Sequence, residues 1–251
     1  MTKLIILGSS NAIATRNHEN AYMVLAGETR TVLIDSPHNP LLRLKEIGID
    51  YDDVTDLVLT HFHPDHVSGI PLFLMDMWLR GRKKALDIHG LNHALTRLEN
   101  LMDAFAWKNW PGFFPVRFNR LPDKGFSPVL SSSDFDIYAS HVRHMIPTIG
   151  LRVESKKSGK VATYSCDTEP CEEVVRLARD ADILIHESSG AFMGHSSSEQ
   201  AAEIATKAGV KELYLIHYPT GEFWNENLLE DARRNFDGEV KLAKDLMELV
   251  F

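Results

Sequence analysis

The chain has 251 residues, which is long enough for one large domain with a substantial core. Hydrophobic residues make up 44% and charged residues 25%, and the net charge of −8 excludes a general basic surface for nucleic acid. The apolar part of Met1–Gly8 is too short for a signal peptide, and no apolar run of about 18 residues suggests a membrane span. The two cysteines, Cys166 and Cys171, do not indicate a disulfide framework, so we expect a cytoplasmic protein.

The first half of the chain predicts an antiparallel opening that is followed by alternating strands and helices. Gly27–Arg30 reads as a hairpin connection between two of the early strands. An aromatic-rich stretch, residues 105–118, reads as irregular: a substrate-facing flap, a dimer contact or a hydrophobic cluster beneath a loop. The predicted strands are residues 4–7, 21–26, 31–35, 57–60 and 85–89, and the predicted helices are residues 41–47, 70–79 and 91–104.

The second half repeats this order. The predicted strands are residues 135–140, 150–154, 160–165, 183–186 and 212–216, with helices at residues 171–178 and 197–208. Antiparallel strands followed by strand and helix alternation, twice over, predict two similar α/β halves packed sheet to sheet with helices outside. No change of composition marks a linker, so we expect residues 1–251 to form one domain.

The most informative stretch, residues 57–69, runs from a short apolar strand into four side chains that can bind metal. In an extended chain alternate side chains point the same way, so His61, His63 and Asp65 can converge on one point. Pro64 favours a turn after His63, which would direct His66 toward a second point nearby. The spacing therefore predicts two metal centres rather than a loop rich in surface histidines.

Three further candidate ligands each follow a predicted strand: His144, Asp167 and His217. Open α/β sheets place their sites at the carboxyl ends of strands, so these residues are expected to join the first cluster. Imidazole and carboxylate ligands suit Zn²⁺, with Mn²⁺ or Fe²⁺ as alternatives. Two such ions about 3.5–4 Å apart can hold a bridging hydroxide as nucleophile, so hydrolysis is the expected reaction class.

His195 is the next candidate for chemistry. It precedes a predicted helix in which Ser196 and Glu199 have capping-box spacing. A histidine beside the free N–H groups of a helix amino terminus can bind phosphate and protonate a leaving oxygen. His195 and Ser196 are therefore candidate substrate-binding residues, the alternative being a surface histidine at a helix cap. Glu187 is close enough to a strand end to orient His195 or a ligand.

Several motifs together resemble metallo-β-lactamase-fold hydrolases, and most of all the ribonuclease Z-like branch. They are T-H-x-H-x-D-H-x-x-G from Thr60, H-x-x-P-x-x-G from His144, S-x-D-T from Ser165, L-I-H-E from Leu184 and G-H-S from Gly194. The resemblance implies a four-layer αββα sandwich and a catalytic role for Asp65 and His195. It further implies one metal on His61, His63 and His144, and another on Asp65, His66 and His217, with Asp167 bridging the two.

The favoured function is a dinuclear metal-dependent phosphodiesterase. Only 22 residues separate His144 from Asp167, where the resemblance would place the long transfer-RNA-binding arm of bacterial ribonuclease Z, so a small phosphodiester is favoured over tRNA. Alternatives are a hydrolase of lactones, thioesters or sulfate esters on the same metals, a true tRNA 3′-processing endoribonuclease, and a non-enzymatic metal-binding scaffold. The resemblance also implies a homodimer formed through residues 70–79 and 91–104.

Overall fold

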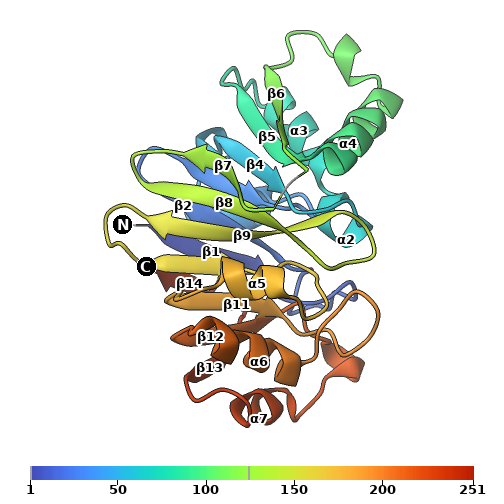
Figure 1. Ribbon diagram of the computed structural model, residues 1–251. Coiled ribbons are helices and arrows are strands. Elements are labelled where there is room, and N and C mark those ends of the chain that lie inside the picture. The colour runs from blue at the N-terminus through green and yellow to red at the C-terminus, as the bar shows by residue number, and fades with distance from the viewer. Residues whose placement is uncertain (1, 124) are drawn as a thin grey trace.

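The computed structural model describes residues 2–123 and 125–251 and consists of two seven-stranded sheets that face each other (Figure 1). The first sheet has the order β14-β1-β2-β3-β4-β5-β6 and the second β13-β12-β11-β10-β9-β8-β7. The strands are β1 (Lys3–Gly8), β2 (Tyr22–Ala26), β3 (Thr31–Ile34), β4 (Asp56–Leu59), β5 (Leu86–Leu91), β6 (Val116–Leu121), β7 (Ser127–Ser131), β8 (Phe135–Val142), β9 (Thr148–Ser155), β10 (Val161–Tyr164), β11 (Ile183–Glu187), β12 (Glu212–Ile216), β13 (Glu239–Leu242) and β14 (Glu248–Val250).

Helices cover the outer faces of both sheets and complete the αββα sandwich that the sequence predicts. One buried cluster fills the space between the sheets, a second lies between the first sheet and its helices, and a third lies under the helices of the second sheet. The helices are α1 (Leu41–Glu46), α2 (Pro64–Val67), α3 (Ile70–Leu79), α4 (Asn92–Ala104), α5 (Glu172–Leu177), α6 (Ser198–Ala208) and α7 (Leu228–Arg233), with 3₁₀ turns η1 (Tyr51–Asp53), η2 (Trp107–Asn109) and η3 (Gly221–Phe223).

The strand directions bring the functional segments to one edge. The strands β1, β2 and β3 pair antiparallel, whereas β3, β4, β5 and β6 pair parallel. The second sheet repeats this pattern, with β7 to β10 antiparallel and β10 to β13 parallel. The carboxyl ends of the parallel strands in each sheet therefore share an edge, where open α/β sheets carry their sites.

The aromatic stretch 105–118 differs from the expected irregular segment. It ends in strand β6, which begins at Val116 and pairs with β5, and its rings pack mainly into the core of the first half. Trp107 and Phe114 are buried, and the ring of Trp110 stacks on that of Trp78 at 4.9 Å. The hydrophobic-cluster alternative thus accounts for most of this stretch. Strands β7, β13 and β14 and helix α7 are further elements that the sequence analysis missed.

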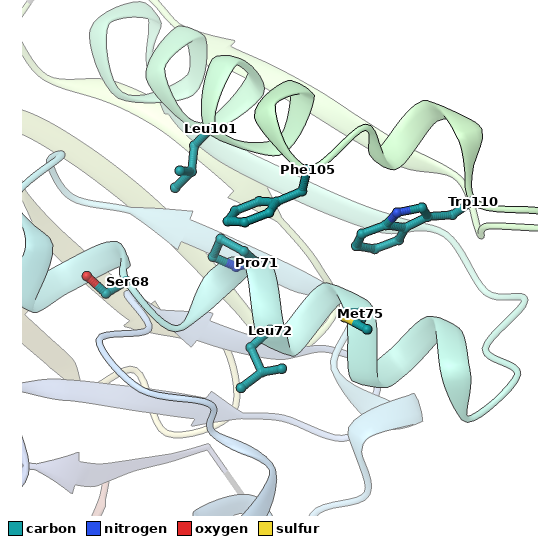
Figure 2. A pocket seen from close by; sticks show the side chains of 7 residues that line it. All are labelled: Ser68, Pro71, Leu72, Met75, Leu101, Phe105 and Trp110. Carbon is teal, nitrogen blue, oxygen red and sulfur yellow. The ribbon is translucent and has the colours of Figure 1, made fainter.

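An apolar groove lies between α3 and α4 (Figure 2). Its volume is about 390 Å³, and its lining includes Leu72, Met75 and Phe105, which are each exposed to solvent. The groove lies on the helical face of the first sheet.

Among the residues that the structure describes, no helix is long and apolar enough to cross a membrane.

Candidate metal centre

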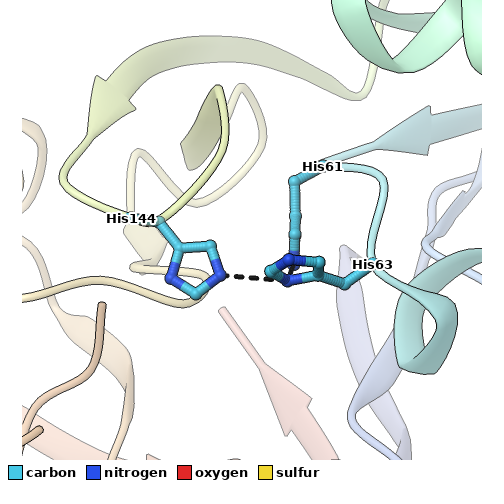
Figure 3. A group of neighbouring side chains, drawn as sticks. All are labelled: His61, His63 and His144. Atoms are coloured by element: carbon cyan, nitrogen blue, oxygen red, sulfur yellow. Dashed lines mark hydrogen bonds between the residues drawn. The ribbon is translucent and has the colours of Figure 1, made fainter. Parts of the chain in front are cut away.

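Three imidazoles converge where β4 ends (Figure 3). His61 and His63 follow β4 directly, and His144 comes from the loop after β8 in the opposite sheet. Nδ1 of His63 lies 3.1 Å from Nε2 of His61 and 3.1 Å from Nε2 of His144. Two nitrogen ligands of a tetrahedral Zn²⁺ are about 3.3 Å apart, so the three atoms have the spacing of a metal site.

Four further ligand atoms gather beside them. Asp65 and His66 lie in the short helix α2, while Asp167 follows β10 and His217 follows β12. The carboxylate oxygen Oδ2 of Asp167 is central: it lies 3.5 Å from His66 Nε2, 3.6 Å from His217 Nε2 and 3.9 Å from His61 Nε2. Asp65 Oδ2 is 3.4 Å from His217 Nε2. The structure thus brings together all seven predicted ligands, with Asp167 between the two groups.

Two cluster histidines come from the second half of the chain, and in each the ring nitrogen that faces away from the cluster is fixed by a hydrogen bond. His144 donates from Nδ1 to the carbonyl oxygen of Gly194 at 2.7 Å, and His217 donates from Nδ1 to the hydroxyl of Ser189 at 2.7 Å. These bonds place the proton on Nδ1 and leave Nε2 with a free lone pair toward the cluster. Neither partner was identified from the sequence.

Asp35 performs the same task for the first half, and sequence reasoning missed this role. Its carboxylate accepts from the backbone N–H of Thr60 at 2.9 Å, from the Thr60 hydroxyl at 2.6 Å and from His66 Nδ1 at 2.8 Å. The Thr60 hydroxyl then accepts from His61 Nδ1 at 3.1 Å. Asp35 has a φ of 61°, an uncommon conformation that packing must maintain. The signal in the sequence was its position at the end of a predicted strand.

The donor set fits divalent cations. His66 Nε2 and Asp167 Oδ1 are buried and have no hydrogen-bond partner within the described residues. Burial opposes ionisation of Asp167, but His217 and His66 outweigh it and hold the pKa of this carboxyl well below its usual value. Burial lowers the pKa of His61 well below its usual value, which keeps that ring neutral. Burying anionic oxygens and lone-pair nitrogens together is energetically costly unless positive charge compensates them. Bound metal ions would supply that charge.

His195 lies next to this cluster and is held by Glu187. Its Nδ1 donates to Glu187 Oε1 at 3.1 Å, and its ring lies edge-on to His144 and stacks on His217 at 5.7 Å. Burial lowers the pKa of His195, but the hydrogen bond and charge of Glu187 outweigh this effect and raise it. The buried Glu187 also accepts from the backbone N–H groups of Thr168, Ser189 and Ser196. Glu187 therefore orients His195, one of the two roles that its position suggested.

The capping box expected at the start of the helix is wrong. The capping box is formed by Ser197 and Gln200 rather than by Ser196 and Glu199, so the helix begins one residue later. Ser196 is buried, its N–H donates to Glu187 and its hydroxyl donates to the carbonyl of Thr168 at 2.6 Å. Because these groups are already engaged inside the protein, Ser196 is not available for substrate. His195 reaches the cluster through its side chain alone.

The fold and this histidine–carboxylate cluster define a metal-dependent hydrolase of the metallo-β-lactamase fold, similar to ribonuclease Z. Ribonuclease Z of Methanothermobacter thermautotrophicus is 28% identical, with 98% of this chain and 96% of that protein covered. The metallo-β-lactamase fold protein YhfI from Bacillus subtilis has a TM-score of 0.82 at 21% identity, covering 99% of this chain and 98% of that one. The short form of human tRNase Z has a TM-score of 0.78 at 21% identity, covering 99% of this chain and 98% of that one.

A family model matches nearly the whole chain. It is described as Anti-Pycsar protein Apyc1, and the match extends over residues 2–237. The chain belongs to this family.

Proposed function

We propose that this chain, residues 1–251 acting as one domain, hydrolyses small phosphodiesters with two divalent metal ions. The observation that carries the proposal is the cluster of seven ligands with His195 beside it. One ion would be held by His61, His63 and His144, and the other by Asp65, His66 and His217, with Asp167 shared between them. Zn²⁺ is the preferred ion because nitrogen ligands predominate, and Mn²⁺ or Fe²⁺ are alternatives.

The chain's own residues account for orientation and proton transfer. Bound divalent ions supply Lewis acidity toward phosphate oxygens and lower the pKa of water at the site. Asp65 is partly exposed beside the cluster, and its carboxylate oxygen lies 3.4 Å from Nε2 of His217, which it helps to orient. Glu187 keeps a proton on Nδ1 of His195, so the protonated ring can donate from Nε2 to the leaving oxygen.

The ribonuclease relatives support a phosphodiester substrate, since the bond that a ribonuclease breaks is a phosphodiester. A small substrate is favoured because β9, β10 and the turn between them occupy most of the segment from His144 to Asp167. The net charge of −8 also offers few cations for the many phosphate contacts that binding of a nucleic acid requires. Cytoplasmic location is supported by the two free, buried cysteines.

A substrate panel tests the proposal. Purified, metal-replete protein is assayed with bis(p-nitrophenyl) phosphate, an aryl sulfate, a lactone, a thioester and a precursor tRNA. We expect turnover of the phosphodiester and weak or absent cleavage of the tRNA. Preference for the sulfate, lactone or thioester would show that the site hydrolyses another class of ester and would contradict the phosphodiesterase proposal. Efficient 3′ trimming of the tRNA at physiological salt would contradict the small-substrate proposal.

We also propose a homodimer through the groove between α3 and α4. Leu72 and Phe105 line the groove, Leu79 lies at the end of α3, and each of the three is more than half exposed, which is costly in water for side chains of this size. A second copy would cover these side chains. Light scattering at micromolar concentration should give twice the chain mass of 28.3 kDa, and Leu72→Asp should shift the mass toward one chain. A monomer mass for the unaltered protein would exclude this interface.

A further inference from the structure

A cavity apart from the metal cluster lies where β12 and β13 end, at the β13 edge of the second sheet. Its volume is about 500 Å³. Three segments form it: the loop after β1, the loop after β12 and the residues that follow β13, with Arg16, Trp224 and Lys244 among the lining residues. The seven proposed metal ligands do not line this cavity, so it is distinct from the metal cluster.

Hydrogen bonds within and between the two loops hold the walls of this cavity in place. Thr15 and His18 exchange backbone hydrogen bonds at 2.8 and 3.4 Å, which fixes the turn that carries Arg16. The hydroxyl of Ser10 lies 2.9 Å from that of the buried Thr220, so the loop after β1 is joined to the loop after β12. The cavity is therefore formed before any ligand enters, as sites for small molecules usually are.

The permanently charged side chains that line the cavity are cationic. Arg16 and Lys244 are both exposed, and neither has an ion-pair or side-chain hydrogen-bond partner among the described residues. The acidic neighbour of Lys244, Asp245, is engaged elsewhere: it accepts from the Ser9 hydroxyl at 2.7 Å and pairs with Arg43 at 3.2 Å. In a chain with a net charge of −8, two unpaired cations at one cavity favour an anionic ligand.

Aromatic rings form another wall of the cavity. Tyr218 is buried, and the rings of His18 and Trp224 meet it edge-on at 6.0 and 5.9 Å. Nδ1 of His18 lies 2.9 Å from the Ser9 hydroxyl, which holds the histidine ring against this wall. Trp224 is 42% exposed, so part of its ring is uncovered. A ligand that carries an aromatic ring could stack on this uncovered surface.

We propose that this cavity binds a small organic anion, with its oxyanion on Arg16 and Lys244 and an aromatic ring on Trp224. Carboxylates and phosphates share the chemistry that these two cations recognise, since both accept charge-assisted hydrogen bonds from arginine and lysine. The proposal adds a ligand site to the β13 edge of the second sheet. It does not depend on the proposed phosphodiesterase function, because none of its residues belongs to the metal cluster.

A fluorescence titration of the unaltered, metal-replete protein tests the site. The probes are benzoate, phenyl phosphate and benzyl alcohol, which carry an aromatic ring with a carboxylate, a phosphate or a neutral hydroxyl. We expect the fluorescence of Trp224 to change saturably with benzoate, with phenyl phosphate or with both, and the tighter probe identifies the oxyanion. Benzyl alcohol should bind about tenfold more weakly. Trp224→Phe should abolish the signal, which distinguishes this cavity from binding of phenyl phosphate at the metals.

Two double variants show whether the cations are responsible. Arg16→Ala combined with Lys244→Ala should raise Kd for the anion by about tenfold or more, because charge-assisted hydrogen bonds are lost. Lys83→Ala combined with Lys207→Ala removes the same charge from exposed lysines elsewhere and should leave Kd unchanged. Metal content should be the same in both double variants, because neither pair includes a proposed ligand.

Four results would overturn the proposal. They are the lack of a saturable change with either anion, equal affinity for benzyl alcohol, a signal that persists in Trp224→Phe, and a Kd that the loss of Arg16 and Lys244 does not raise above that of the control pair. Hydrolysis is not measured in any of these experiments, so their failure would leave the phosphodiesterase proposal untouched.

Discussion

The two halves of the chain build their shares of the metal centre in different ways. The first half contributes four of the proposed ligands within six residues, and a single carboxylate, Asp35, fixes His66 directly and His61 through Thr60. The second half contributes residues from the ends of separate strands. His144, His217 and His195 are each held by a partner of their own, namely Gly194, Ser189 and Glu187.

This difference has a physical consequence. In the first half one side chain orients ligands of both proposed ions, so its loss should weaken both sites together. In the second half each partner orients a single imidazole. Removing one partner should therefore affect only one metal site or only proton transfer. Four substitutions examine this contrast, in order of decreasing expected effect.

The largest effect is expected for Asp65→Ala. Asp65 is a proposed ligand in the first-half segment and also lies close to His217 from the second half, so its removal should open one site and leave His217 without this neighbour. Activity should fall by several orders of magnitude. Elemental analysis should find about two metal ions per unaltered chain, in line with the two groups of ligands, and preferential loss of one in the variant. The exposed Asp237→Ala is the matched control. Folded protein that contains no metal after expression in metal-replete medium would contradict the dinuclear proposal.

His195→Ala should lower kcat by about 10²–10⁴-fold while both metals stay bound, because the proton donor is lost and no ligand is. The comparison variant is His38→Ala, which removes an exposed histidine and should retain full activity. If the His195 variant turned over at the unaltered rate, the ring would have only a structural role. Loss of metal from the His195 variant would mean that His195 also supports metal binding, although its hydrogen bonds do not indicate this.

Asp35→Asn should lower metal affinity at both sites by about 10–100-fold, the usual effect of altering a partner of a metal ligand. The amide keeps the volume of the carboxylate but can turn an NH₂ group toward the donor Nδ1 of His66, which breaks that bond. Competition with a chromogenic chelator resolves the two affinities. Weakening of one site alone would refute the view that Asp35 serves both.

The smallest effect is expected for Ser189→Ala, which removes the acceptor for Nδ1 of His217 and leaves the other rings untouched. Affinity should fall by about tenfold at one site, the lower end of the range for such partners. The same chelator titration provides the measurement. Equal loss at both sites would show that the two halves are coupled through Asp167 more strongly than the geometry indicates.

Much of the fold was readable from the sequence because its signals are local. The apolar strands, the helix at residues 70–79 and the order of strands and helices predicted the sandwich, and the spacing of His61, His63, Asp65 and His66 predicted the metal segment. The missed elements β7, β13 and β14 lie at or next to sheet edges, where short strands lack the continuous apolar pattern of central ones.

Sequence alone determined which residues could bind metal, since ligand chemistry and short-range spacing belong to the residues themselves. Tertiary structure decided which side chains fix them, because these partners lie far along the chain: Asp35 is 25 residues from Thr60, and Gly194 is 50 from His144. It also decided that the N–H groups of Ser196 and Ser197 are engaged by Glu187 and Gln200, which places the capping box one residue later than expected. A hydrogen-bond donor is available to a ligand only if no neighbour in the folded chain has taken it, and packing determines those neighbours.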